Sequence, residues 1–272
     1  MNFRHIILTR FNLQFDPQST IHIQETWLHE RIRLFKQYCL PAIEQQTSHN
    51  FTWVLLASDH TPEHAKNLLL ECTQSHSYIR VHFCPYTDNL NAMYKSIGQE
   101  YAIGYAYLLS TRMDNDDMLA ANFVETLQAH LRKPQNKFSF YTFPHGIQLF
   151  ETDQQAFGVR FDRNHFLSLL EPTTDVSTCL GFDHTQVPTN QLIKLKEKAM
   201  WCEIVHNSNI CNDYTPKYKY SIGIKNLLYP ISFKPYTKKF LSQCIFLMGG
   251  YIRFRSRFCL RIIEKVFCGR AS

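Results

Sequence analysis

The 272-residue chain has no run of about 18 consecutive apolar residues, so we expect no helix that crosses a membrane. Met1 to His5 form no continuous apolar segment, so we expect no secretory signal peptide. The nine cysteines show no CxxC pair and no metal-ligand spacing. We therefore expect reduced, mostly buried thiols in a cytoplasmic protein. The basic C-terminal segment described below further predicts a location at the inner face of the membrane.

The C-terminal part almost lacks acidic side chains. Residues 217–272 hold twelve Lys and Arg but one acid, Glu264, while residues 1–216 carry a net charge of −5. Bulky apolar residues alternate with arginines, as in Tyr251 to Phe258. This pattern predicts a basic amphipathic helical segment that lies on an anionic membrane. A packed terminal helix with a solvated basic face is the main alternative, and nucleic acid is not an expected partner.

The first 216 residues are predicted to form one α/β domain. With 44% hydrophobic and 14% aromatic residues, the chain can bury a full-sized core. Apolar runs that read as strands alternate with segments of helical periodicity, which favours a mostly parallel sheet with helices on both faces. We expect strands at 5–9, 51–57, 78–83, 106–111 and 137–143, and helices at 26–46 (kinked or divided at Pro41), 62–74 (capped by Thr61), 89–103 and 118–132.

Three of these strands end in polar residues: Thr9-Arg10, Ser58-Asp59 and Arg112-Met113-Asp114. In parallel α/β sheets, ligands bind at the carboxyl ends of the strands. We therefore expect these three strand ends to converge on one site.

The segment Asp114-Asn115-Asp116-Asp117 follows the fourth strand directly. Carboxylates spaced in this way can hold Mg²⁺ or Mn²⁺ against a diphosphate leaving group, whose charge the ion neutralises. A solvated helix cap is the alternative, since acidic turns are common. The position straight after an apolar strand favours the metal site, with Asp114 and Asp116 as its carboxylates.

Several segments together resemble the rhamnosyltransferase family of GT-A-type glycosyltransferases. They are His5 to Asn12, Trp27 to Pro41, Phe51 to Val54, Asp59 to Pro62, Arg112 to Asp117 and Trp201 to Asn209, and they span most of residues 3–215.

The resemblance implies a GT-A-type nucleotide-sugar-binding fold over residues 1–216. It implies that Thr9, Arg10 and Phe11 line the nucleotide pocket, that Asp59 contacts the base, and that Asp114 and Asp116 are the Asp-x-Asp motif. It also implies transfer of a sugar, rhamnose by expectation, from a nucleotide-diphosphate donor to a glycan or lipid-linked glycan in surface polysaccharide synthesis.

A glycosyltransferase of this kind also needs a further metal ligand and, for some reactions, a catalytic base. His206 follows a short apolar strand and is a candidate metal ligand, supported by the resemblance, because imidazole suits Mn²⁺ beside carboxylates. A base is required if the anomeric configuration inverts, and Asp183 and Glu171 are the candidates, with Asp175 behind them. An ordinary exposed carboxylate is the alternative for each.

Three other positions have two interpretations. Arg112 either contacts the donor or pairs with Asp116 or Asp117, and Arg31 either reaches donor phosphate or forms a structural ion pair. His145-Gly146 shapes a substrate loop or a simple turn.

Two other functions are alternatives to the glycosyltransferase. A nucleotidyltransferase would usually carry a glycine- and basic-rich loop after the first strand, which Thr9 to Asn12 is not. A non-catalytic membrane-surface protein would not bind nucleotide.

Overall fold

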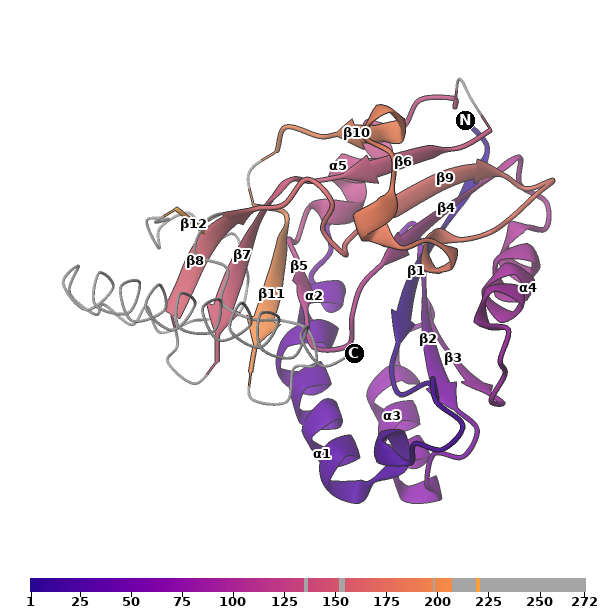
Figure 1. Ribbon diagram of the computed structural model, residues 1–272, viewed down its shortest axis with the longest axis vertical. Coiled ribbons are helices and arrows are strands. Elements are labelled where there is room, and N and C mark those ends of the chain that lie inside the picture. Colours follow the sequence, from indigo (N-terminus) through magenta and orange to yellow (C-terminus); the bar gives the residue numbers. More distant parts are fainter. Residues whose placement is uncertain (135–136, 152–154, 198, 207–218, 221–272) are drawn as a thin grey trace, which may run out of the picture.

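Alternating strands and helices build the first half of the chain, in the computed structural model, which describes residues 1–134, 137–151, 155–197, 199–206 and 219–220. The elements largely follow the hydrophobic pattern of the sequence (Figure 1). They are β1 (Phe3–Arg10), α1 (Glu25–Leu34), β2 (Thr52–Ser58), α3 (Glu63–Thr73), β3 (Ile79–Cys84), α4 (Leu90–Ala102) and β4 (Tyr107–Arg112).

The larger sheet has seven strands in the order β10-β6-β9-β4-β1-β2-β3. Its later members are β6 (Ser139–Thr142), β9 (Ser168–Pro172) and β10 (Leu192–Lys194). Strand β9 runs antiparallel to both of its neighbours, and the other neighbouring pairs are parallel. The expectation of an α/β fold with a mostly parallel central sheet is therefore confirmed.

Period-two alternation divides the core between the two faces of this sheet. In β1, Ile7 packs into one apolar cluster while Ile6 and Leu8 pack into the other. The first cluster also receives α1 and α3, and the second receives α4. Helices thus cover both faces, because successive side chains of a buried strand point to opposite sides.

A second, five-stranded sheet was not expected from the sequence. Its order is β12-β8-β7-β11-β5, and its members are β5 (Met118–Leu119), β7 (His145–Phe150), β8 (Gln155–Arg160), β11 (Trp201–Val205) and β12 (Lys219–Tyr220). Figure 1 shows it beside α1 and the nearby α2 (Leu40–Glu44). The inner side chains of β7 and β11 join the same apolar cluster as α1. The sheet therefore extends the core and forms a second wall beside the ends of β1 and β4.

The helix predicted at 118–132 is shorter than expected. It spans only α5 (Phe123–Ala129), because Met118 and Leu119 instead form β5 and pair with Cys202 and Trp201 of β11. A partner more than 80 residues away thus overrode the local pattern. The cap predicted at Thr61 is also wrong. The Thr61 hydroxyl donates to the Ser58 carbonyl, and Pro62 stands at the N-cap of α3.

The helix predicted at 26–46 is continuous but widens in the middle. Between α1 and α2 lies the π-helical turn η2 (Phe35–Cys39), which ends two residues before Pro41. Proline lacks an N–H and crowds the carbonyl one turn earlier, so a wider turn accommodates it without a break. The turn also brings the Cys39 thiol to 3.7 Å from the Asp114 carbonyl, directly against the acidic segment.

The basic segment predicted at 217–272 lies outside the described residues, except for Lys219 and Tyr220. These two residues form β12 and pair with β8, just past the predicted boundary at residue 216. Within the described part of the chain, no helix combines the length and the apolar character needed to span a bilayer.

Gly146 is a point of close approach between β7 and β11. A Cβ atom at this position would lie 2.2 Å from two ring atoms of Trp201. The indole is fixed there, because its N–H donates to the Phe143 carbonyl at 2.7 Å and its ring stacks on Phe166. Gly146 is therefore required by packing, which differs from both the substrate-loop and the turn interpretations.

Gly146→Ala is expected to lower the free energy of unfolding by about 1–3 kcal/mol, since the buried indole has no room to move away. Gly181→Ala is the matched control, because its Cβ would meet only the Asn91 side-chain oxygen at 3.9 Å. Urea unfolding of both variants measures the difference. Equal stability of the two variants would contradict this packing argument.

Candidate active site

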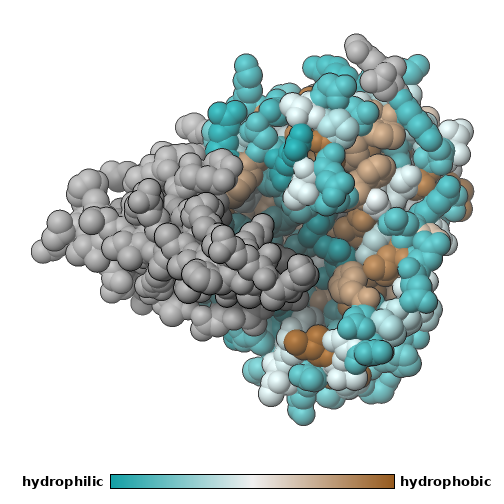
Figure 2. All heavy atoms as spheres, in the orientation of Figure 1, coloured by the Kyte–Doolittle hydropathy of each residue, from teal (hydrophilic) through white to brown (hydrophobic). Residues whose placement is uncertain are grey.

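The carboxyl ends of β1 and β4 open into a cavity of about 810 Å³. Arg10, Phe11 and Asn12 line it from β1, and Arg112 and Asp114 to Asp116 line it from β4. The two strands are parallel neighbours, with Leu8 opposite Arg112, so both end at this edge. Figure 2 shows the same face hollowed near its middle, with hydrophilic side chains deep in the hollow and hydrophobic ones at its edges.

The ends of β1 and β4 form the floor of the cavity, and two walls enclose it. The first comes from the loop after β1 and from α1, with Phe15, Ile21, His22, Trp27 and Arg31. The second comes from the second sheet (Gln148, Trp201 and Glu203), from the loop between β8 and β9 (Phe161, Arg163, Asn164 and His165) and from the segment between β9 and β10 (His184 and Thr185). The cavity thus lies between the two halves of the chain.

The predicted strand ends converge in part. Arg10, Phe11 and Asp114 line the cavity, whereas Thr9 is buried beneath it and accepts a hydrogen bond from the Trp53 indole at 2.9 Å. The Asp59 side chain is 40% exposed and does not line the cavity. The end of β2 reaches the site through Asn12, whose side-chain oxygen accepts from the Ser58 N–H at 3.3 Å.

Asp114 is held by arginines. The Arg112 guanidinium donates to both carboxylate oxygens, at 3.2 and 3.0 Å, and Arg10 lies 3.9 Å away. Burial favours the neutral acid, but the charges of Arg112 and His165 outweigh it and hold the pKa of Asp114 well below its usual range. Arg112 therefore forms an ion pair within the motif, with Asp114 rather than with Asp116 or Asp117 as predicted, and lines the cavity as well.

Asp116 lies deeper, between α1 and the end of β11. Its Oδ2 accepts from the Arg31 guanidinium at 2.6 Å and lies 2.9 Å from the His206 Nε2. Both members of the ion pair are buried. The structural ion pair considered for Arg31 is therefore present, and the two predicted metal ligands Asp116 and His206 are in contact.

Asp117 is the most buried of the three carboxylates. It lies 2.8 Å from the His165 Nε2 and accepts from the Ile204 N–H at 3.0 Å. Burial raises the pKa of Asp117 to about 7, and the negative charge of Asp116 adds to this rise. The hydrogen bond from His165 acts in the opposite direction and lowers the pKa, but it does not outweigh burial. For His165, burial favours the neutral ring, but the hydrogen bond and charge of Asp117 prevail and raise its pKa to about 9.

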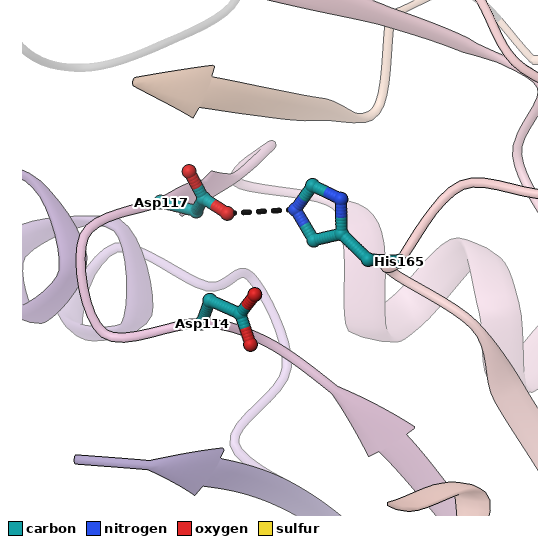
Figure 3. A group of neighbouring side chains, drawn as sticks. All are labelled: Asp114, Asp117 and His165. Atoms are coloured by element: carbon teal, nitrogen blue, oxygen red, sulfur yellow. Dashed lines mark hydrogen bonds and ion pairs between the residues drawn. The ribbon is translucent and has the colours of Figure 1, made fainter. Parts of the chain in front are cut away.

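One set of these side chains has the spacing of a metal site. Figure 3 shows Asp114 and Asp117 facing the imidazole of His165. One ligand atom from each of the three lies within 4.8 Å of the others. Two carboxylates and an imidazole suit a divalent cation such as Mn²⁺. The residues present are therefore compatible with a divalent cation.

The two predicted catalytic carboxylates lie outside the cavity. Glu171 is buried on β9 opposite Leu108, at the far end of β4 from Asp114, and accepts from the Ser177 and Thr178 N–H groups at 2.8 Å. Burial raises the pKa of Glu171 to about 7 despite these two bonds. Asp183 is half exposed and caps a short 3-10 turn, although its neighbour His184 does line the cavity.

Comparison with known protein families identifies a match that covers most of the chain. A family model described as "Putative rhamnosyl transferase" matches residues 9–218, which include the whole acidic segment and both walls. The chain belongs to this family.

Solved structures that this chain partly resembles include two of S. aureus TarS. The fragment 1–349 has a TM-score of 0.41 and 12% identity over 75% of this chain and 60% of that chain. A longer TarS structure has a TM-score of 0.39 and 12% identity over 75% of this chain and 37% of that one. A nucleotide-diphospho-sugar transferase from Desulfovibrio desulfuricans G20 has a TM-score of 0.35 and 7% identity over 73% and 81%. This rhamnosyl transferase family member thus spans about 60% or less of the TarS chains, and it matches no curated protein.

Sequence reasoning missed His165 and Glu203 as residues of the site. Nothing in Arg163-Asn164-His165 marks a ligand, because the loop is shaped by long-range bonds. The Asn164 side-chain N–H₂ donates to the Thr142 hydroxyl and to the Phe143 and Phe161 carbonyls at 2.9–3.0 Å. Glu203 lies on β11, which ends at Val205 just before His206. Its position between the apolar Cys202 and Ile204 was the available signal, because alternating strand residues point to opposite faces.

The buried Arg31–Asp116 pair generates a stability prediction. Arg31→Met leaves a buried carboxylate without its guanidinium and is expected to cost about 3–5 kcal/mol in the free energy of unfolding. Arg33→Met is the control on the same helix, because its partners Glu30 and Glu151 are partly exposed, and about 1 kcal/mol is expected there.

Adding Asp116→Asn to Arg31→Met is expected to restore part of the lost stability, since a neutral amide needs no counter-charge. Denaturant unfolding of the single and double variants forms the test. A double variant less stable than Arg31→Met would contradict the ion-pair interpretation.

Proposed function

We propose that this chain transfers a sugar from a nucleotide-diphosphate donor to a glycan or lipid-linked glycan, within a GT-A-type fold and with a divalent cation. The family match and the cavity between the two halves support this proposal. The single observation that carries it is the placement of a carboxylate cluster and two arginines, Arg10 and Arg112, at the same strand ends. A diphosphate needs both kinds of group, because the carboxylates hold its cation and the guanidiniums bind its oxygens.

In this proposal the cation binds between Asp114, Asp117 and His165, in place of the Asp114, Asp116 and His206 set predicted from the sequence. The Asp116 Oδ2 is buried against the Arg31 guanidinium at 2.6 Å, and that positive charge disfavours a cation at the same atom. Among the described residues no guanidinium donates to Asp117, and the partly exposed Asp114 accepts from Arg112 at the longer distances of 3.2 and 3.0 Å. Asp116 and His206 would then brace the acidic loop from behind. The ion would supply charge neutralisation for the leaving nucleoside diphosphate.

The donor would occupy the end of the cavity formed by the loop after β1. Arg10 and Arg112 lie 3.9 and 3.0 Å from the Asp114 carboxylate there, and Phe11 supplies an apolar surface. Thr9 would act from beneath by fixing the end of β1 through Trp53. Asp59 does not line the cavity. It would therefore contact only the part of the donor that lies furthest from the diphosphate, the nucleotide base.

Nucleoside diphosphates are expected to bind in a Mn²⁺-dependent manner, which isothermal titration calorimetry measures. Asp114→Asn and Asp117→Asn should each weaken the Mn²⁺-dependent binding at least about tenfold, because each removes a negative ligand. Asp88→Asn, an exposed carboxylate outside the cavity, should bind like the wild type. Wild-type protein that bound no nucleoside diphosphate, with or without Mn²⁺, would refute the proposed function.

The basic segment at 217–272 would hold the enzyme on an anionic membrane, next to a lipid-linked acceptor. The support is its sequence, with twelve basic residues and one acid among bulky apolar side chains. In a flotation assay with anionic liposomes, the full chain is expected to float with the vesicles and a 1–235 truncation to remain in the dense fraction. Equal flotation of the two proteins would exclude this role.

A further inference from the structure

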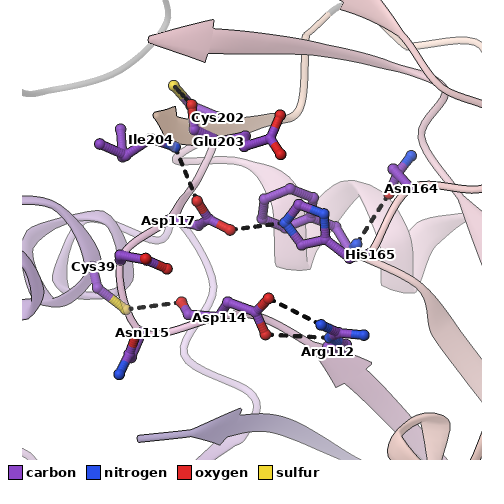
Figure 4. A network of polar contacts seen from close by, with 12 residues as sticks. Cys39, Arg112, Asp114, Asn115, Asp117, Asn164, His165, Cys202, Glu203 and Ile204 are labelled. Atoms are coloured by element: carbon purple, nitrogen blue, oxygen red, sulfur yellow. Dashed lines mark hydrogen bonds and ion pairs between the residues drawn. The ribbon is translucent and has the colours of Figure 1, made fainter. Parts of the chain in front are cut away.

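Glu203 is a buried carboxylate of the second wall that the account above does not use. It extends from β11 and lines the cavity together with Asn164 and His165 (Figure 4). Its Oε2 accepts from the Gln148 side-chain N–H₂ at 2.6 Å. Among the described residues, no Lys, Arg or His comes within ion-pair distance of it.

The other carboxylates of the cavity lining are neutralised. Asp114 pairs with Arg112, and Asp116 pairs with Arg31. A carboxylate that is bound to a guanidinium gains little by taking up a proton. The His184 ring also lines the cavity, but burial and then the charge of Arg112 lower its pKa to about 4, which makes it a weak base. Of the carboxylates that line the cavity, Glu203 is thus the one with no cationic partner among the described residues.

Gln148 fixes the direction of this carboxylate. A carboxylate accepts hydrogen bonds and cannot donate them, so the amide N–H₂ of Gln148 must face Glu203. The amide oxygen of Gln148 then points elsewhere, and it is buried without a donor among the described residues. A buried acceptor of this kind favours a ligand or water that brings an O–H group. Both side chains line the cavity, so this wall presents hydrogen-bond acceptors to its contents.

A hydroxylated ring matches these acceptors. A sugar brings several O–H donors, whereas a diphosphate brings only acceptors and would be repelled by Glu203. Arg10 and Arg112, which suit the diphosphate, lie at the strand ends on the floor. The two kinds of surface therefore separate within one cavity, with anion-binding groups at the floor and hydroxyl-binding groups on the second wall.

We propose that Gln148 and Glu203 form the subsite for the acceptor sugar and that Glu203 is the catalytic base. This inference rests on the proposed function. The acceptor O–H proton moves to the Glu203 carboxylate while the acceptor oxygen forms a bond to C1 of the donor sugar. The bond from C1 to the β-phosphate oxygen breaks, and the nucleoside diphosphate leaves with the electron pair. The anomeric configuration inverts, and Gln148 is a positioning residue for Glu203.

The test measures nucleoside diphosphate released by the full-length protein with Mn²⁺. The donors are UDP-, GDP- and dTDP-linked hexoses and deoxyhexoses, and the acceptor is a total lipid and polysaccharide extract of the source cells. Glu203→Gln keeps the shape and the bond from Gln148 but cannot take up a proton. It is expected to lower kcat at least about 100-fold, while the Mn²⁺-dependent affinity for the released nucleoside diphosphate stays within about twofold. Glu63→Gln, an exposed carboxylate on α3, should match the wild type.

Glu203→Asp separates a base from a structural residue. Asp keeps the carboxylate but shortens its reach, so a base predicts more turnover in Glu203→Asp than in Glu203→Gln. A purely structural role predicts the reverse order, which would overturn the inference. Melting curves check the fold, and if Glu203→Gln does not fold, wild-type turnover in Glu203→Asp would overturn the inference while a loss of at least about tenfold supports it.

The two proposals fail in different ways. Glu203→Gln turnover within about threefold of the wild type would overturn the role of Glu203 and leave the proposed function standing. Wild-type protein that released no nucleotide from any donor would overturn both proposals.

Discussion

Three carboxylates lie within four consecutive residues at the end of β4, where Asp116 and Asp117 are buried and Asp114 is partly exposed. Their mutual repulsion in a partly desolvated loop must be offset by partners, since an unpaired buried charge is among the most destabilising features a fold can contain. Each carboxylate has a different partner: Arg112 for Asp114, Arg31 for Asp116 and His165 for Asp117. The loop is therefore a point at which distant parts of the chain are required to meet.

This requirement explains why the second sheet stands where it does. The Ile204 N–H of β11 donates to Asp117, and His206 at the end of the same strand contacts Asp116. Trp201 of that strand packs on Gly146 and Phe166, which places the loop of His165 opposite the acidic segment. The same contacts that stabilise the carboxylates thus build the second wall of the cavity. A substitution that breaks these contacts should therefore affect both the stability of the acidic loop and the shape of the site.

The sequence predicted the first half of the fold well because its signals are local. Alternation in β1 and β2 and helical periodicity in α3 and α4 are read within one element, and parallel strands then bring Arg10 and Asp114 to one edge. Asp116 and His206, predicted together as metal ligands, lie in contact with each other. The misses come from contacts across the chain. The pairing of Met118 with Cys202 turned a predicted helix into strand β5, and the three bonds of Asn164 placed His165 in the site without a local motif.

The central claim is that Asp114, Asp117 and His165 hold a divalent cation against the diphosphate of the donor. Its most direct test is a crystal of the full chain grown with MnCl₂ and a nucleoside diphosphate, with diffraction recorded for the anomalous signal of manganese. We predict one strong anomalous peak within about 2.5 Å of a carboxylate oxygen of both aspartates and of the His165 imidazole nitrogen. A peak bound by Asp116 and His206 instead, or a nucleotide bound in the cavity with no manganese beside it, would contradict the account.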